Sequence, residues 1–176
     1  VVPGSDSLGL PASFITFDAD ELRINFDALQ VQQGFAFELV FDLQLTGTNV
    51  GDTLISGDGN DVINGLGGSD NIQAGAGNDV INGGTGVDII DGGDGIDTLN
   101  FVDATNTQKI NLVTNVNIGG FANNDTFHNI ENVIGSDTRG DDITGTAGTN
   151  VLEGRGAADF LRGFNGDDTL LGGEGN

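Results

Sequence analysis

Several residue types that often mark a function are missing from this chain of 176 residues. It has no cysteine, methionine, tryptophan or tyrosine, and it has one histidine and two prolines. Without cysteine the chain cannot form a disulfide, and zinc and copper lose their usual thiolate ligands. No stretch approaches the roughly 18 apolar residues of a membrane-spanning helix, so we expect no membrane span.

Positive charge is also scarce, with 5 basic residues against 27 acidic ones and a formal net charge of −22. A surface with this charge repels nucleic acids and anionic membranes, and it attracts cations. We therefore expect no nucleic-acid partner. We also expect the compact state to suffer strong self-repulsion unless bound cations neutralise part of the charge.

What the chain does have is a repeat of nine residues, which runs through residues 47–100 six times without an insertion or a deletion. Glycine fills most of positions one, two and four of the repeat. The sixth position is always acidic and the eighth is always aliphatic. The acidic residues are Asp52, Asp61, Asp70, Asp79, Asp88 and Asp97, and the aliphatic residues are Leu54, Ile63, Ile72, Ile81, Ile90 and Leu99.

This pattern predicts a stack of short strands joined by tight turns. Glycine lets positions one to six take positive φ and form a turn, which leaves positions seven to nine as a very short strand. A strand with one apolar side chain must face an equivalent strand across a thin core. Two repeats therefore form one coil of 18 residues, and the acidic residues of successive repeats alternate between two edges of the stack.

Carboxylates on one edge would repeat every 4.8 Å or so, which is the spacing of hydrogen-bonded strands, and they would repel one another without a cation between them. Calcium suits this place because it accepts about six to eight oxygen ligands, including backbone carbonyls, in a tolerant geometry. Magnesium demands a stricter octahedron and suits it less. The sequence predicts inter-coil sites at Asp52 with Asp70, Asp70 with Asp88, Asp61 with Asp79, and Asp79 with Asp97.

The repeat resembles the calcium-binding nonapeptide of the repeats-in-toxin (RTX) family, with its consensus Gly-Gly-x-Gly-x-Asp-x-aliphatic-x. The resemblance implies an all-β fold, a calcium-stabilised parallel β-roll. It also implies a bacterial protein that leaves the cell through a type I secretion system. Members of the family stay unfolded at the low calcium concentration of the cytosol and fold in the medium.

Residues 101–138 interrupt the period and form a connecting segment. The stretches 101–105, 109–118 and 126–136 read as strands, because apolar residues roughly alternate in them. The segment is also similar to RTX proteins, where one roll is often joined to the next through a sequence of the type found here at residues 130–136. We expect longer strands that continue the sheets, and a loop at residues 119–125 that bulges out. His128 has no ligand partner at a suitable spacing and is expected to pack or to lie on the surface.

The period resumes near Gly140, so residues 139–176 predict a second roll, which stops within a repeat as a piece of a longer protein would. Here Ala157 replaces a glycine, and Arg155 and Arg162 bring positive charge close to the acidic positions. We expect this roll to bind calcium more weakly than the first. Its predicted ligands are Asp141 with Asp159 and Asn150 with Asp168, which brings the expected total to about six calcium ions.

Residues 1–46 differ from the repeats, since they hold six of the eleven phenylalanines and few glycines. Alternating apolar residues predict strands at 22–26 and 35–45 with a turn at 32–34, and an earlier strand at 14–17. This N-terminal β-hairpin or short-strand segment could cap the roll, belong to a larger sheet, or pair with another subunit. We favour the cap.

The sequence predicts no enzyme, because it contains no His-Glu-x-x-His or Gly-x-Ser-x-Gly motif and no acid pair outside the calcium positions that stands out. We expect an extracellular or cell-surface structural or adhesive module, which folds on binding Ca²⁺ and assembles into a layer or filament. Self-association could run head to tail or through the N-terminal strands. The alternative is a non-catalytic accessory domain of a secreted protease, lipase or alginate epimerase.

Overall fold

The structure, a computed structural model, describes residues 15–18, 21–24 and 40–175. Its contacts divide the chain into two compact units, Val1–Leu39 and Val40–Asn176. In the first unit, strand β1 (Ile15–Asp18) pairs with β2 (Glu21–Ile24) in antiparallel fashion. The predicted turn at 32–34 and residues 35–39 of the predicted strand at 35–45 lie outside the described residues; of residues 40–45, only 44 and 45 are in a strand.

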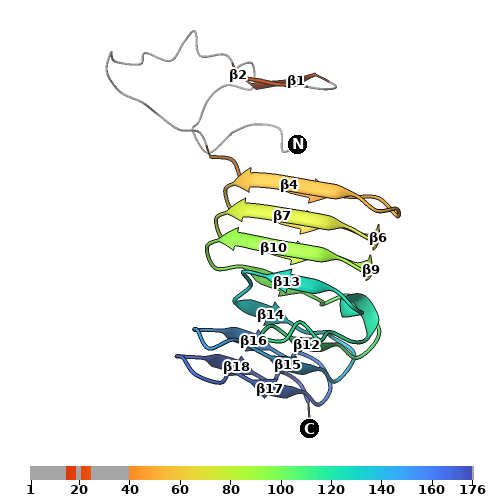
Figure 1. Ribbon diagram of the computed structural model, residues 1–176, viewed down its shortest axis with the longest axis vertical. Helices are drawn as coiled ribbons and strands as arrows, with labels where there is room; N and C mark the ends of the chain where they lie inside the picture. The colour runs from red at the N-terminus through yellow and green to blue at the C-terminus, as the bar shows by residue number, and fades with distance from the viewer. Residues whose placement is uncertain (1–14, 19–20, 25–39, 176) are drawn as a thin grey trace. The chain divides into compact units, whose positions relative to one another are not determined.

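The second compact unit is a parallel β-roll, whose strands stack one above another in Figure 1. One face is a continuous sheet of seven parallel strands. In sequence order these are β3 (Gln44–Thr46), β5 (Val62–Asn64), β8 (Val80–Asn82), β11 (Thr98–Asn100), β14 (Asn132–Ile134), β16 (Val151–Glu153) and β18 (Thr169–Leu171).

The opposite face is divided into two sheets. The first holds four parallel strands, β4 (Thr53–Asp58), β7 (Asn71–Ala76), β10 (Ile89–Asp94) and β13 (Thr126–His128). The second holds β12 (Lys109–Asn111), β15 (Asp142–Thr144) and β17 (Phe160–Arg162). A small pair, β6 (Gly67–Gly68) with β9 (Thr85–Gly86), lies in the turns. The two blocks of repeats therefore share one sheet and are divided only on the other face.

Strand pairing places the aliphatic residue of each repeat directly beside its equivalent one coil away. Ile63 pairs with Ile81, and Leu99 pairs with Ile81 on one side and with Val133 on the other. All four are at most 1 % exposed. The single apolar position of each repeat thus builds a thin core between the two faces, as its period predicts. The all-β parallel roll expected from the sequence is confirmed.

The connecting segment differs from the expectation in three respects. Residues 101–105 form no strand, and of residues 109–118 only the first three do. Strands β12, β13 and β14 have three residues each, so they continue the sheets but are not longer than those of the repeats. The loop at 119–125 does not simply bulge out, because its short 3₁₀ helix η2 (Gly120–Ala122) buries Ala122 and lies against β9.

Strands in the first block also depart from the prediction. Three strands of the four-stranded sheet are six residues long, because they continue from position seven of one repeat to position three of the next. Strand β3 falls within the predicted N-terminal segment, yet it pairs with β5 and belongs to the seven-stranded sheet. Among the described residues no helix is long and apolar enough to cross a membrane.

Candidate metal sites

The acidic residues at position six form two ladders along the edges of the roll. In each predicted pair, the backbone N–H of one residue donates to the side-chain Oδ1 of the residue 18 positions later, at 2.8–3.0 Å. The structure brings together all six pairs that the sequence predicts: Asp52 with Asp70, Asp70 with Asp88, Asp61 with Asp79, Asp79 with Asp97, Asp141 with Asp159, and Asn150 with Asp168.

The second carboxylate oxygen of most ladder residues is buried and has no hydrogen-bond partner. A buried polar atom without a partner is costly, and a buried charge is far more so. Such an atom in a folded protein needs an explanation, and coordination of a cation supplies one. The oxygens concerned are Oδ2 of Asp61, Asp70, Asp79, Asp88, Asp97 and Asp159.

Backbone carbonyls lie beside the Oδ2 atoms of the ladder aspartates. A methyl group built on Gly47 would lie 2.9 Å from Oδ2 of Asp52 and 2.7 Å from the carbonyl oxygen of Gly65 in the next coil. A methyl group on Gly65 would meet Oδ2 of Asp70 and the carbonyl of Gly83 in the same way. Glycine at position one therefore keeps open a small cradle between a carboxylate and a carbonyl.

The dimensions of the ladder suit calcium. Two oxygens one coil apart are separated by roughly 4.8 Å, and one calcium ion with bonds of about 2.4 Å spans that distance. Magnesium, with bonds of about 2.1 Å and a strict octahedron, fits the same gap less well. Among the described residues no three His, Asp or Glu side chains gather into a metal site by themselves. The ligands on offer are carboxylates from neighbouring coils and the turn carbonyls.

Burial changes the proton affinity of the ladder. Removal from water raises the pKa of Asp88 and of Asp97 to about 6, and hydrogen bonds from the backbone of Asp70 and Asp79 oppose the rise. Burial also raises the pKa of Asp79 above its usual range, and the charge of Asp61 adds to this effect. The metal-free ladder therefore holds its negative charges at a cost, which a divalent cation would remove.

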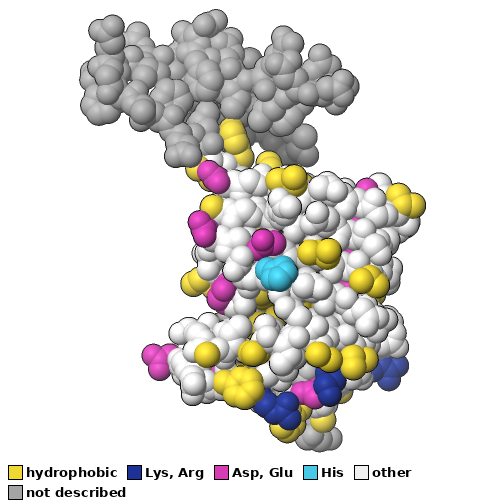
Figure 2. Space-filling model, in the orientation of Figure 1, with side chains coloured by type: hydrophobic (Ala, Val, Ile, Leu, Met, Phe, Trp, Pro, Cys, Tyr) yellow, Lys and Arg dark blue, Asp and Glu magenta, His cyan; other side chains and the backbone are white. Residues whose placement is uncertain are grey.

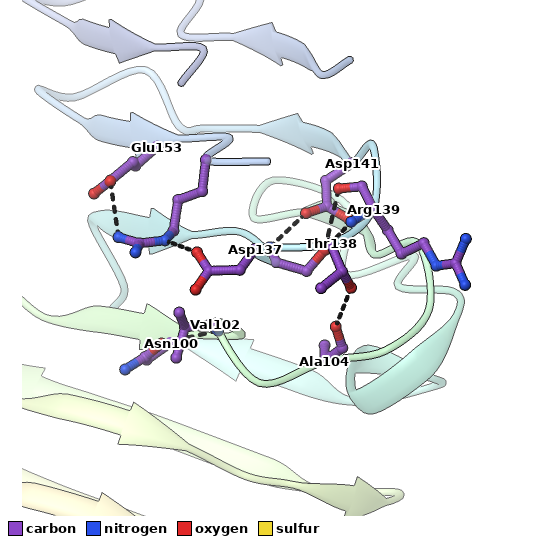
Figure 3. A network of polar contacts seen from close by, with 10 residues as sticks. Asn100, Val102, Ala104, Asp137, Thr138, Arg139, Asp141 and Glu153 are labelled. Carbon is purple, nitrogen blue, oxygen red and sulfur yellow. Dashed lines mark hydrogen bonds and ion pairs between the residues drawn. The ribbon is translucent and has the colours of Figure 1, made fainter. Parts of the chain in front are cut away.

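The second block offers fewer free oxygens. Both oxygens of Asp141 are satisfied, because Oδ1 accepts the Gln108 N–H and Oδ2 accepts the Ser136 N–H, each at 2.7 Å. Figure 3 shows Asp141 against the turn that contains Thr138 and Arg139. Asp168 keeps the ladder bond to its partner but is only partly buried.

Asn150 uses its amide for a different purpose. Its Nδ2 donates to the carbonyl oxygen of Glu131 at 2.6 Å, and its Oδ1 accepts the Thr146 N–H at 2.8 Å. A side-chain amide thus bridges two coils where a carboxylate would need a cation. The sequence-based expectation of weaker calcium binding in this block stays a prediction, but the geometry supports it.

Two ladder residues escaped the sequence analysis. Oδ1 of Asp125 accepts the Asp88 N–H at 2.7 Å, and Oε2 of Glu131 accepts the Asp97 N–H at 2.9 Å. Asp125 is 2 % exposed, and burial raises its pKa to about 7. The sequence does contain a signal for both residues. Asp125 and Glu131 each stand two positions before a core residue, Phe127 or Val133, just as position six of the repeat stands two positions before position eight.

The basic residues lie away from the first block. Lys109, Arg139, Arg155 and Arg162 all belong to the later coils, and Figure 2 shows Lys and Arg gathered there while acidic side chains lie along the earlier coils. Arg155 pairs with Asp137 and Glu153, both labelled in Figure 3, and not with a ladder carboxylate. His128 is exposed on β13, as the sequence analysis allowed.

Comparison with known proteins agrees with the geometry. The family model of the RTX calcium-binding nonapeptide repeat matches in four copies, over residues 46–72, 64–99 and 144–176. No curated protein matches the chain. The matched segments cover nearly all of the first block and most of the second, and they contain the six unpartnered carboxylates described above. The chain therefore carries RTX calcium-binding nonapeptide repeats, and its roll is a calcium-binding RTX module.

Proposed function

We propose that this chain is a structural or adhesive module of a secreted bacterial protein, and that it folds when it binds calcium outside the cell. The observation that carries the proposal is the set of six buried carboxylate oxygens without partners. Each of them opposes folding while it is charged and without a cation. The proposed ligands are the carboxylates and the amide oxygen of the two ladders, together with the turn carbonyls.

Charge supports a coupling between calcium and folding. About six calcium ions would add about twelve positive charges to a chain with a formal charge of −22, which leaves about −10. At the low calcium concentration inside a cell this compensation is missing, so the chain would stay unfolded and ready for export. At the higher concentration outside, binding energy becomes folding energy.

The proposal includes self-association into a layer or filament. Residues 40–100 contain no basic residue, and the later coils carry four of the five in the chain. A second copy stacked head to tail would place these basic residues beside the acidic first coils of its neighbour, in an arrangement that does not close.

The test is a calcium titration followed by far-UV circular dichroism and light scattering on the same samples, with magnesium as the control. The proposal expects β signal that appears cooperatively with calcium, little response to magnesium, and scattering that rises with folding. A chain that is equally folded in a chelator would contradict calcium-coupled folding. A folded monomer would contradict assembly and favour the alternative, an accessory domain of a secreted enzyme.

A further inference from the structure

We propose a calcium site at the junction of the two blocks, formed by Asp97, the backbone carbonyl of Asn129 and the carboxylate of Glu131. The inference rests on the proposed function, because it assumes that the ladders bind calcium. It goes beyond that function by assigning ligands to residues that lie outside the nonapeptide repeats. Residues 129–131 also lie outside the segments that match the RTX repeat.

The first step is the shape of the turn. Asp91 pairs with His128, and Thr98 pairs with Asn132. Between Asp91 and Thr98 the repeat has a turn of six residues (92–97). Between His128 and Asn132, in the next coil, the turn has only three residues (129–131). In this shortened turn Asn129 follows the residue paired with position nine, so it stands where position one stands in the repeat, and Glu131 precedes β14 directly, as position six precedes its strand.

The second step is how the shortened turn replaces the missing residues. Glutamate is one methylene longer than aspartate, and Oε2 of Glu131 reaches the Asp97 N–H at 2.9 Å, the same bond that ladder aspartates make. Asn129 takes the left-handed conformation at φ 50°, which asparagine tolerates better than most residues. Its Nδ2 donates to Oδ1 of Asp91 at 2.7 Å, which ties this turn to the neighbouring coil.

The third step is the cradle between these groups. A methyl group built on Gly92 would lie 2.5 Å from Oδ2 of Asp97 and would also collide with the carbonyl oxygen of Asn129. This is the arrangement that Gly65 shows inside the repeats, with Asp70 and the carbonyl of Gly83. Asp97 is fully buried, and its Oδ2 has no partner. A buried charged oxygen therefore points into a cradle that a second oxygen also borders.

Room for further ligands lies beside the turn. A cavity of about 250 Å³ is lined by Leu112, Phe127, Asn129, Ile130, Glu131 and Thr146. Calcium commonly completes its coordination with water, and a cavity of this size can hold several water molecules. The donor set at the junction is two carboxylates, one carbonyl and water, and all of these are oxygen ligands that calcium prefers.

The position of the site gives it a consequence for folding. The face formed by the four-stranded and three-stranded sheets is divided between β13 and β12, whereas the seven-stranded sheet continues from β11 through β14 to β16. The proposed ion lies at the step from β11 to β14. It would therefore tie the first block to the connecting segment at a step where both faces are paired, because β10 also pairs with β13 there. The seven-stranded sheet then continues from β14 to β16 in the second block, so the ion would let both blocks fold in one transition.

The test counts calcium ions by native mass spectrometry and by calorimetric titration in the wild type, Glu131→Gln and the matched control Glu174→Gln. Glu174 is exposed, so its substitution makes the same charge change away from the ladders. The proposal expects Glu131→Gln to lose one ion, or to bind one ion at least tenfold more weakly, and to show two calcium-dependent folding transitions in place of one. The control should match the wild type.

A second variant blocks the cradle without changing charge. Gly92→Ala would fill the space between Asp97 and Asn129, whereas Gly172→Ala meets no atom within 4 Å and serves as its control. If Glu131→Gln and Gly92→Ala keep the wild-type ion count and affinities, the junction site is wrong while the calcium module stands. If the wild type binds no calcium, the proposed function itself fails.

Discussion

Asp79 lies between Asp61 and Asp97 in one of the two ladders. Its replacement by asparagine should lower the stability of the folded protein in calcium and raise it without calcium. Its Oδ1 accepts the Asp61 N–H, and its own N–H donates to Asp97, so it takes part in two predicted sites. Asparagine keeps the oxygen that accepts the ladder bond. It replaces the buried, unpartnered Oδ2 with an uncharged NH₂ group.

The expected magnitudes follow from that position. An ion present at 100 times its dissociation constant stabilises the folded state by about 2.7 kcal/mol, so the loss of two sites removes about 5 kcal/mol in calcium. In a chelator the substitution removes repulsion from two neighbouring carboxylates, which is about 3 kcal/mol for each pair 5 Å apart at an effective dielectric constant of 20. The new NH₂ group is buried without a hydrogen-bond partner, which costs about 1–3 kcal/mol and reduces that gain. The metal-free fold should therefore gain a few kcal/mol.

Asn150 shows what such an amide can do, because its Nδ2 donates to the carbonyl of Glu131 in the neighbouring coil. The assay is urea unfolding in saturating calcium, and refolding by an osmolyte such as trimethylamine oxide in EDTA. Asp94→Asn is the control, because Asp94 is exposed in the same block. If Asp79→Asn destabilised the protein equally in both conditions, or no more than the control in calcium, the reasoning would be refuted.

Three further predictions concern backbone strain, pH and the core. Ala157 has φ 65°, a left-handed conformation that costs a residue with a side chain roughly 1 kcal/mol. Ala157→Gly should therefore raise the free energy of unfolding in urea by about that amount, and the control Ala158→Gly should not. Because burial raises the pKa of Asp97 to about 6 and of Asp125 to about 7, the folded metal-free protein binds more protons than the unfolded chain between about pH 4 and 7. Its stability should therefore rise as the pH falls from 7.5 to 5. Refolding in EDTA, followed by circular dichroism, would contradict the assignment if it needed more trimethylamine oxide at pH 5 than at pH 7.5. Ile81 is fully buried between two equivalent strands, so Ile81→Ala should cost about 2–5 kcal/mol in calcium, and a loss below about 1 kcal/mol would mean that the thin core contributes little.

The nine-residue period predicted the regular part of the roll because it determines turn length and strand register together. Ile63, Ile81 and Leu99 are 18 residues apart and lie side by side in the seven-stranded sheet. The alternation of aspartates between two edges follows from the same count, and the structure has it. Where every turn has six residues, counting along the sequence is equivalent to following the strand pairing.

Counting fails where turn length changes. Between β11 and β13 residues 101–125 stand where a repeat has a turn of six residues, and the turn at 129–131 is three residues shorter than those of the repeats. Glu131 therefore follows Asp97 by 34 residues and not 18. Phe127 occupies a position that is aliphatic in all six repeats, which hid the role of Asp125 two residues before it. Strand pairing determines which residues face each other, and a pattern with irregular turns does not reveal that pairing.

The central claim is that calcium lies between carboxylates of neighbouring coils. Its most direct test is a crystal structure of the chain grown in calcium, with data collected at a wavelength where calcium scatters anomalously. We expect anomalous peaks on both edges of the first block, between Asp61 and Asp79, between Asp79 and Asp97, and between Asp70 and Asp88. A folded roll without peaks in these gaps, or with peaks only at exposed carboxylates such as Asp58, would contradict the claim.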